Sequence, residues 1–192
     1  MDVQYIASVC LFALFVASVM IRSAMMRRRG VRAIVFGQTD KSDFLLVPLV
    51  FAIAYTALAG TFGLPVWPVL IRPFWSSRFP GWFGLALCAA AVAGIVATLY
   101  SFGDSFRVGI DEQKPDKLIT SGTFAISRNP IYVCFLMFFT GLFLIHRNIV
   151  IAVAVLLFAM AIHRQIVREE KFLTAHYGGE YEEYRGRVRR YL

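Results

Sequence analysis

The sequence has few of the charged residues that soluble proteins place on their surfaces. Only 17% of its 192 residues are charged, whereas a soluble domain carries about a quarter. No Asp or Glu lies between Phe44 and Gly103, and nine of the twelve acidic residues lie between Asp104 and Glu183. Hydrophobic residues make up 58% of the chain and lie in blocks. The composition therefore excludes an ordinary soluble domain and predicts one integral membrane domain spanning residues 1–192.

Residues that mark common metal, disulfide and hydrolase sites are also scarce. The three cysteines, Cys10, Cys88 and Cys134, all fall inside apolar blocks, which predicts neither a disulfide framework nor a metal site. The sequence has no glycine-rich phosphate loop and no Ser-His-Asp set, and His163 and His176 are isolated. These absences leave the polar residues at the ends of the apolar blocks as the candidates for chemistry.

Five apolar blocks predict an all-α membrane protein with about five transmembrane helices. The first three reach the roughly 20 residues that cross a bilayer, and the third is rich in alanine and glycine, which predicts that it is the central packing helix. The last two are short and are separated only by residues 146–148, so we expect a hairpin that tilts, thins the bilayer or continues as helix beyond it. The blocks are Val3–Ile21, Phe44–Val66, Trp82–Tyr100, Ile131–Ile145 and Ile149–Ile162.

The positive charges are distributed unequally between the two sides of these blocks. Seventeen Lys and Arg residues lie in residues 22–42, 103–130 and 164–192, and only Arg72, Arg78 and Arg147 lie elsewhere. The positive-inside rule then predicts an N-terminus outside and a C-terminus in the cytosol. The net charge of +8 suits anionic lipid headgroups rather than nucleic acid. The short loops and compact tail favour a prokaryotic plasma membrane, and the oligomeric state is left open.

The polar loop before the fourth block is a candidate binding site. Pro130 suits the first position of a helix, where its missing N–H costs nothing, and Asn129 or Ser127 could cap that helix. The free N–H groups of Ile131 and Tyr132 would then form an anion-binding helix end. The alternative is simply a well-capped membrane helix.

The hairpin geometry brings a second polar segment to this loop. Pro130 lies 17 residues before Arg147 and Arg164 lies 17 after it, so antiparallel helices place Pro130 opposite Arg164. Glu169 and Glu170 then lie level with Arg128 and Asn129, near Arg107 and Arg168. Such a set suits a small zwitterionic or cationic ligand, with Tyr132 offering an aromatic face to a cation. The alternative is a set of glutamates that only pair with arginines on a solvated helix face.

The C-terminal tail predicts a short amphipathic helix after a glycine turn. Tyr177, Tyr181 and Tyr184 recur at helical spacing on one face. We expect this helix to cover the site and to contact lipid headgroups.

Four polar motifs follow one another in the second half of the chain. They are Lys117 to Phe124, then Arg128-Asn129-Pro130-Ile131-Tyr132, then Glu169-Glu170, and then Gly178-Gly179-Glu180-Tyr181-Glu182-Glu183-Tyr184. In this order they resemble the isoprenylcysteine carboxyl methyltransferase family, a membrane-embedded group of S-adenosylmethionine enzymes to which phospholipid N-methyltransferases are related. The resemblance covers residues 103–190, and residues 1–102 match only as generic membrane helices.

The resemblance implies that S-adenosylmethionine lies on the cytosolic side, between the loop and the hairpin, and that a lipophilic substrate enters from the bilayer. Together with the hairpin geometry it predicts catalytic roles for Arg128, Glu169 and Arg164; cofactor contacts for Lys117, Leu118, Ile119, Gly122, Asn129, Pro130, Tyr132, Glu169 and Glu170; and substrate contacts for Arg107, Gln165 and Arg168.

Two positions depart from the family pattern. Asn129 replaces the usual His, and an amide cannot change charge near neutral pH. Gln165 stands where the carboxyl methyltransferases place an Arg for the substrate carboxylate. Despite these two departures, the resemblance implies an S-adenosylmethionine-dependent methyltransferase acting on an isoprenylcysteine-like acid. The alternatives are a phospholipid, amine or thiol methyltransferase, an NADPH-dependent membrane reductase, for which 192 residues is short, and a non-enzymatic scaffold.

Overall fold

A computed structural model describes residues 2–28, 46–101 and 118–192. Every regular element within these ranges is a helix, which confirms the predicted all-α membrane architecture. The helices are α1 (Val3–Arg28), α2 (Leu46–Phe62), α3 (Pro68–Ile71), α4 (Phe79–Ser101), the 3₁₀ helix η3 (Gly122–Ala125), α5 (Pro130–His146), α6 (Ile149–Tyr177) and α7 (Gly179–Arg187).

The helices differ in length from the apolar blocks, most clearly in the second and the last block. Helices α1, α4 and α6 are long and apolar enough to cross a membrane, whereas α2 and α5 are shorter apolar helices of 17 residues. The second block ends early because Gly63 takes a φ of 70° and Pro65 follows. The last block is extended instead: α6 has 29 residues, or roughly 43 Å at 1.5 Å per residue. It therefore continues as helix beyond the thickness of a bilayer, as one of the predicted options allowed.

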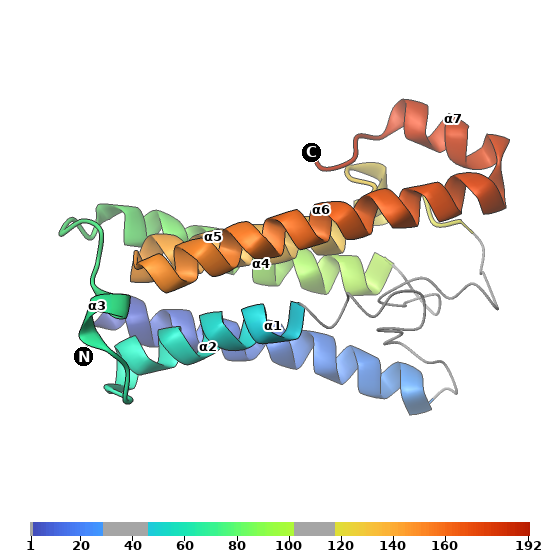
Figure 1. Cartoon of the computed structure of the whole chain (residues 1–192). Helices are drawn as coiled ribbons and strands as arrows, with labels where there is room; N and C mark the ends of the chain where they lie inside the picture. The colour runs from blue at the N-terminus through green and yellow to red at the C-terminus, as the bar shows by residue number, and fades with distance from the viewer. Residues whose placement is uncertain (1, 29–45, 102–117) are drawn as a thin grey trace.

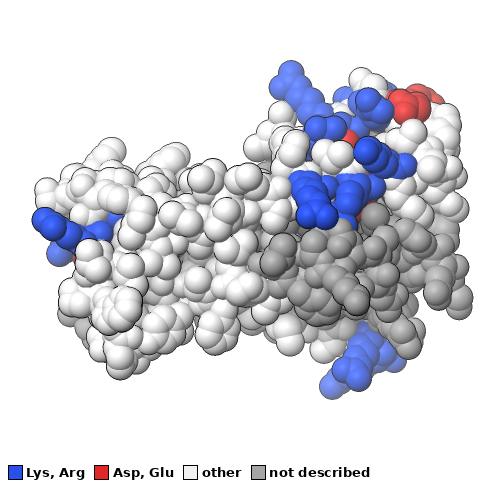
Figure 2. Space-filling model, in the orientation of Figure 1, with Lys and Arg blue, Asp and Glu red and all other residues white. Residues whose placement is uncertain are grey.

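The bundle has two distinct ends (Figure 1). The N-terminus, α3 and the turn between α5 and α6 lie at one end, and the last turns of α6, together with α7, lie at the other. In the space-filling view, Lys and Arg side chains gather at the two ends, mainly at the α7 end, and the band between them carries almost no charge (Figure 2). This separation is what a bilayer requires of a membrane-spanning bundle.

Helix α5 is the central helix of the bundle. It contacts α1, α2, α4 and α6, and ten of its 17 residues are buried, against seven of 23 in α4. The third block nevertheless packs closely as predicted, because α4 forms the two most extensive helix contacts of the described bundle, with α5 and with α1. Helix α5 differs from α4 in contacting four other helices and in being more deeply buried.

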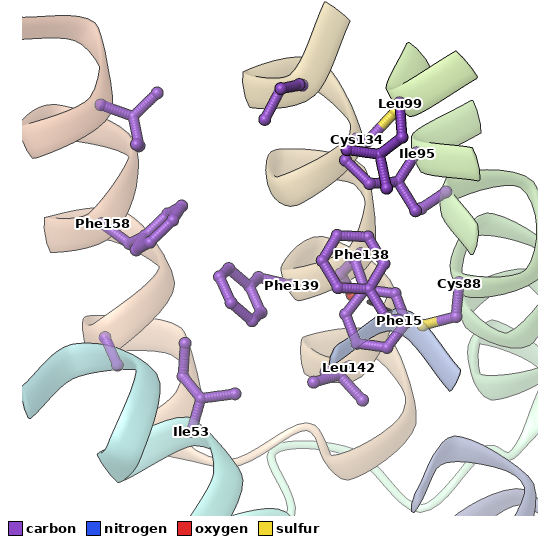
Figure 3. Close-up of a cluster of buried hydrophobic side chains, with 14 of the residues drawn as sticks. Phe15, Ile53, Cys88, Ile95, Leu99, Cys134, Phe138, Phe139, Leu142 and Phe158 are labelled. Carbon is purple, nitrogen blue, oxygen red and sulfur yellow. Dashed lines mark hydrogen bonds between the residues drawn. The ribbon is translucent and has the colours of Figure 1, made fainter. Parts of the chain in front are cut away.

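Aromatic side chains from α5 join the two sides of the core (Figure 3). The Phe138 ring stacks on Phe15 of α1 with 4.6 Å between centroids, and the Phe139 ring meets Phe158 of α6 edge-on at 4.7 Å. In lipid, where the hydrophobic effect between helices is lost, such contacts stabilise the bundle through tight packing.

The small residues of α4 do allow a close approach to α5, as their composition predicts. A Cβ added to Gly84 would lie 2.6 Å from the Gly141 carbonyl oxygen, and one added to Gly141 would lie 2.6 Å from the Cys88 sulfur. A larger side chain at either glycine would push the two helices apart. This contact fixes the position of α5, whose first turn carries the candidate site.

Candidate functional site

The candidate site lies at the α7 end of the bundle, where α5 begins. The loop leading into α5 rests on the end of α4. The Thr123 N–H donates to the Ser101 hydroxyl at 3.2 Å. Gly122 takes a φ of 65°, and a Cβ there would lie 2.4 Å from the same hydroxyl oxygen. Gly122 thus has a structural reason for being glycine, because it lets η3 dock against α4.

The start of α5 differs in part from the sequence expectation. Pro130 is at the first helical position, as predicted. Asn129 occupies the N-cap position, but no side-chain cap hydrogen bond forms there. The Ser127 hydroxyl accepts instead from the Asn129 N–H at 3.1 Å. The predicted capping of α5 is therefore wrong, because the Asn129 amide group is engaged by partners on α6 and the tail.

Glu170 on α6 meets the loop as the hairpin arithmetic predicts. One oxygen, Glu170 Oε1, accepts from Asn129 Nδ2 at 3.4 Å and lies 3.3 Å from Arg128 Nη2. The side chains of Arg128 and Glu170 are only 8% and 10% exposed. A buried carboxylate of this kind needs cationic partners to offset its desolvation.

The second cation on Glu170 is Arg190, which the sequence reasoning missed. Its guanidinium donates from Nε to both oxygens of Glu170, at 3.1 and 3.0 Å, and from Nη2 to Oε2 at 2.8 Å. The hydrogen bonds that Arg190 donates to Glu170 raise the pKa of Arg190. The sequence pattern assigns the arginines of the tail only to lipid headgroups. The two adjacent glutamates of α6, which would require a cation if either were buried, are the signal that could have indicated Arg190.

Glu169 belongs to a neighbouring group of side chains joined by hydrogen bonds. Its Oε1 accepts from the Tyr132 hydroxyl at 2.6 Å and from Gln165 Nε2 at 2.9 Å. Arg168 in turn donates to Gln165 Oε1. The structure therefore brings together Tyr132, Glu169, Gln165 and Arg168. Arg164, the residue before Gln165 on α6, is exposed.

Helix α7 covers the site, in agreement with the predicted turn and helix. Gly178 connects α6 to α7 with a φ of 53°. Tyr181 and Tyr184 are buried, and the Tyr184 hydroxyl donates to the Phe124 carbonyl at 2.7 Å. Burial raises the pKa of Tyr184 to about 12 and also raises the pKa of Tyr181. Both hydroxyls therefore stay protonated at any pH near neutrality.

Arg128 retains unused donors. Within the described ranges, its buried Nε and Nη1 atoms have no hydrogen-bond partner. Buried guanidinium groups normally have their N–H groups satisfied. Two such donors, on a guanidinium already fixed by Glu170, are suited to an anionic group of a ligand, which a guanidinium can hold with paired hydrogen bonds.

The remaining predicted residues can be placed only in part. Leu118 and Ile119 are half-buried in the segment before η3. Arg107 and Lys117 lie outside the described residues. No group of His, Cys, Asp and Glu that could hold a metal ion occurs in the part of the chain that the structure describes.

The fold and this site define a helical membrane protein with a covered, charged site at one end of its bundle. The family model described as phospholipid methyltransferase matches residues 79–180, which is more than half of the chain. The chain belongs to this family of membrane methyltransferases, to which the isoprenylcysteine carboxyl methyltransferases are related. No curated protein sequence matches the chain significantly. The family match runs from α4 into α7 and stops before Tyr181, Tyr184 and Arg190.

Proposed function

We propose that the protein is an S-adenosylmethionine-dependent methyltransferase that acts on a lipophilic, membrane-derived acceptor at the site between α5, α6 and α7. The observation that carries the proposal is the pairing of opposite charges there. A carboxylate, Glu169, is oriented by two neutral donors, and a buried guanidinium, Arg128, has donors to spare. These groups complement the ammonium and carboxylate ends of an amino-acid ligand.

The side chains present are compatible with this cofactor. Glu169 can accept from an ammonium group or from ribose hydroxyls, and Arg128 can hold a carboxylate. The family resemblance adds main-chain contacts from Lys117, Leu118 and Ile119 to the adenosyl part. Both oxygens of Glu170 are already bound by Arg190, Arg128 and Asn129. We assign cofactor binding to Glu169, as the family resemblance implies, and a supporting role to Glu170.

When bound, S-adenosylmethionine supplies an electrophilic methyl group that the lone pair of an acceptor displaces from sulfur, leaving S-adenosylhomocysteine. The protein's own contribution is to hold the reactants in line and to exclude water. Tyr132 and Gln165 fix the direction of the Glu169 carboxylate. Helix α7 closes the site with the buried rings of Tyr181 and Tyr184.

For the acceptor we propose the carboxylate of an isoprenylcysteine-like acid. Gln165 replaces the Arg of the carboxyl methyltransferases, but Arg168 donates to its side-chain oxygen and so brings a cation to this position. A carboxylate is already ionised and needs no general base. The second candidate is a phospholipid amine or a similar lipophilic amine or thiol, which the description of the matching family model favours.

We further propose that the site faces the cytosol, with the N-terminus on the opposite side. The unequal distribution of Lys and Arg supports this orientation, as does the position of the basic ends Arg27 and Arg28 of α1 and Arg185 and Arg187 of α7. A cytosolic site has direct access to a soluble cofactor, and the membrane-facing helices give a lipophilic acceptor a route from the bilayer.

Ligand binding to the detergent-purified protein tests the proposal first. Calorimetric titration should detect S-adenosylhomocysteine but not NADPH. Membranes incubated with methyl-labelled S-adenosylmethionine should then yield label in the lipid fraction. Release of that label as methanol by base identifies methyl esters, and base-stable label in phospholipid headgroups identifies the amine acceptor. NADPH binding without S-adenosylhomocysteine binding would contradict the proposed function.

A further inference from the structure

Residues 188–192, which we call the C-terminal strap, cross the segment that leads into α5. The Arg128 N–H donates to the Arg189 carbonyl at 3.0 Å. The Ser127 hydroxyl and the Asn129 side-chain amide both donate to the Arg190 carbonyl, at 3.4 and 3.1 Å. The strap is thus attached to three successive residues of the candidate site through its own main chain.

The Arg190 side chain continues this attachment on α6. Its guanidinium holds both oxygens of Glu170 in a fork, a geometry that a lysine ammonium cannot reproduce. Glu170 also accepts from Asn129 Nδ2 and pairs with Nη2 of Arg128. The Glu170 carboxylate therefore binds two guanidinium groups and one side-chain amide.

The orientation of the Asn129 amide follows from these partners. A carboxylate oxygen and a carbonyl oxygen are both pure acceptors, so the nitrogen of the amide must face Glu170 and Arg190. The strap thereby orients the Asn129 side chain so that its nitrogen faces Arg190 and its oxygen faces away from it. This is the position where the family resemblance places a histidine.

The contact between Arg190 and Glu170 also determines which N–H groups of Arg128 Glu170 uses. Arg128 gives only Nη2 to Glu170, and its Nε and Nη1 remain without partners among the described residues. If Arg190 were absent, Oε2 of Glu170 would lose the donors that hold it. A carboxylate in that state would turn toward the nearest remaining guanidinium, which belongs to Arg128.

We infer that Arg190 is a positioning residue that saturates Glu170 and so keeps Nε and Nη1 of Arg128 available for the carboxylate of the amino-acid part of the ligand. This inference rests on the proposed function. It assigns the strap a role in affinity for one part of the cofactor, in addition to its attachment to the loop. The adenosine part should be bound independently of the strap.

Two ligands that differ in the amino-acid part test the inference. S-adenosylhomocysteine carries a carboxylate and an ammonium, and methylthioadenosine carries neither. In Arg190→Met, the Kd for S-adenosylhomocysteine should rise about tenfold, the loss expected for charge-assisted hydrogen bonds to the ligand carboxylate. The Kd for methylthioadenosine should stay unchanged. Arg187→Met removes an exposed arginine paired only with exposed Glu183, and this control should bind both ligands as the wild type does.

A second substitution tests the mechanism behind the effect. Glu170→Gln in the Arg190→Met background removes the charge that would recruit Arg128, so affinity for S-adenosylhomocysteine should recover relative to Arg190→Met alone. If Arg190→Met does not fold, Arg190→Lys replaces it, because lysine keeps the charge but cannot bind both oxygens of Glu170. The ratio of its Kd for S-adenosylhomocysteine to its Kd for methylthioadenosine is then compared with that of the wild type.

Equal weakening of both ligands in a folded Arg190 variant would overturn the inference and leave the strap as a purely structural attachment, with the proposed function intact. Failure of the wild type to bind either ligand would overturn the proposed function, and the inference with it. A selective loss for S-adenosylhomocysteine that Glu170→Gln reverses supports both.

Discussion

The α5–α6 hairpin buries polar residues at both of its ends, but in different ways. At the end we call the turn end, residues 146–148 are all buried. His146 Nε2 lies 3.0 Å from the Ser8 hydroxyl, which itself donates to the Tyr5 carbonyl at 2.7 Å. Asn148 caps α6 by accepting from the Ile151 N–H at 3.0 Å. The Arg147 guanidinium donates from Nη1 to the Ser77 carbonyl, in the segment between α3 and α4. The partners at this end are thus neutral side chains or main-chain groups.

At the site end, charged side chains of opposite sign pair with one another instead. Glu170 is shared by Arg128 and Arg190, which come from segments on either side of the hairpin. Arg128 retains two donors that nothing in the described chain uses. A buried guanidinium with an unpartnered N–H occurs at both ends, in Arg147 and in Arg128. The two ends differ in the partner of that guanidinium, which is a main-chain carbonyl at the turn end and a carboxylate at the site end.

Glu169→Ala should have the largest effect, and only at the site end. Loss of the carboxylate removes the group proposed to bind the cofactor, so binding of S-adenosylhomocysteine and methyl transfer should both fall by about 100-fold or more. The thermal unfolding midpoint in detergent should change little. Glu183→Ala, an exposed carboxylate on α7, is the matched control. Unchanged affinity for S-adenosylhomocysteine in Glu169→Ala would refute the assignment.

His146→Leu should affect stability but not ligand binding. The substitution removes the partner of Ser8 and the ring stacked on Tyr5 at 4.6 Å. We expect a loss of about 2 kcal/mol in the free energy of unfolding, as for other buried hydrogen-bonded groups. His176→Leu replaces an exposed histidine and should stay within about 0.5 kcal/mol of the wild type. A marked loss of cofactor affinity in His146→Leu would show that the two ends are coupled.

Tyr184→Phe should cost about 1 kcal/mol of stability, because only the hydrogen bond to the Phe124 carbonyl is lost. The folded pKa of about 12 lies above the ordinary value of 10. The contribution of the protonated hydroxyl is therefore fully present below pH 10 and is lost as the pH rises toward 12. The stability difference between variant and wild type should be flat from pH 6 to 9. A difference that titrates within this range would contradict the assignment.

Arg185→Ala should have the smallest effect. Arg185 pairs with Glu182 at 3.3 Å, and both side chains are about half exposed, at 52% and 51%. Exposed pairs of this kind contribute less than about 1 kcal/mol, so unfolding and cofactor affinity should both match the wild type closely. A strong loss of activity in membranes, with normal activity in detergent, would instead point to a lipid contact on this face of α7.

Local sequence pattern was sufficient for the hairpin and for much of the site. Counting from Arg147 placed Glu170 beside Asn129, and the structure confirms this pairing. The count works because two helices with a short connection have the same rise per residue. It could not predict which glutamate is held by Arg128 and Arg190, since that depends on the directions of side chains one residue apart.

The errors have physical causes that lie outside local pattern. Asn129 does not cap α5 with its side chain, whose Nδ2 instead donates to Glu170 and to the strap. The depth of burial of α5, which contacts four other helices, is likewise set by the arrangement of the whole bundle. Arg190 was missed because nothing in its spacing relates it to Glu170, 20 residues earlier, until α7 turns the chain back.

The sequence by itself determined the membrane class, the helical content, the polar hairpin ends and the family, because these depend on composition, periodicity and motif order. Only the tertiary structure decided which charges meet. Folding α7 and the strap over the start of α5 delivers a second arginine to one buried carboxylate and leaves donors on the first. Such pairings depend on distances between segments far apart in the chain, and no local pattern records them.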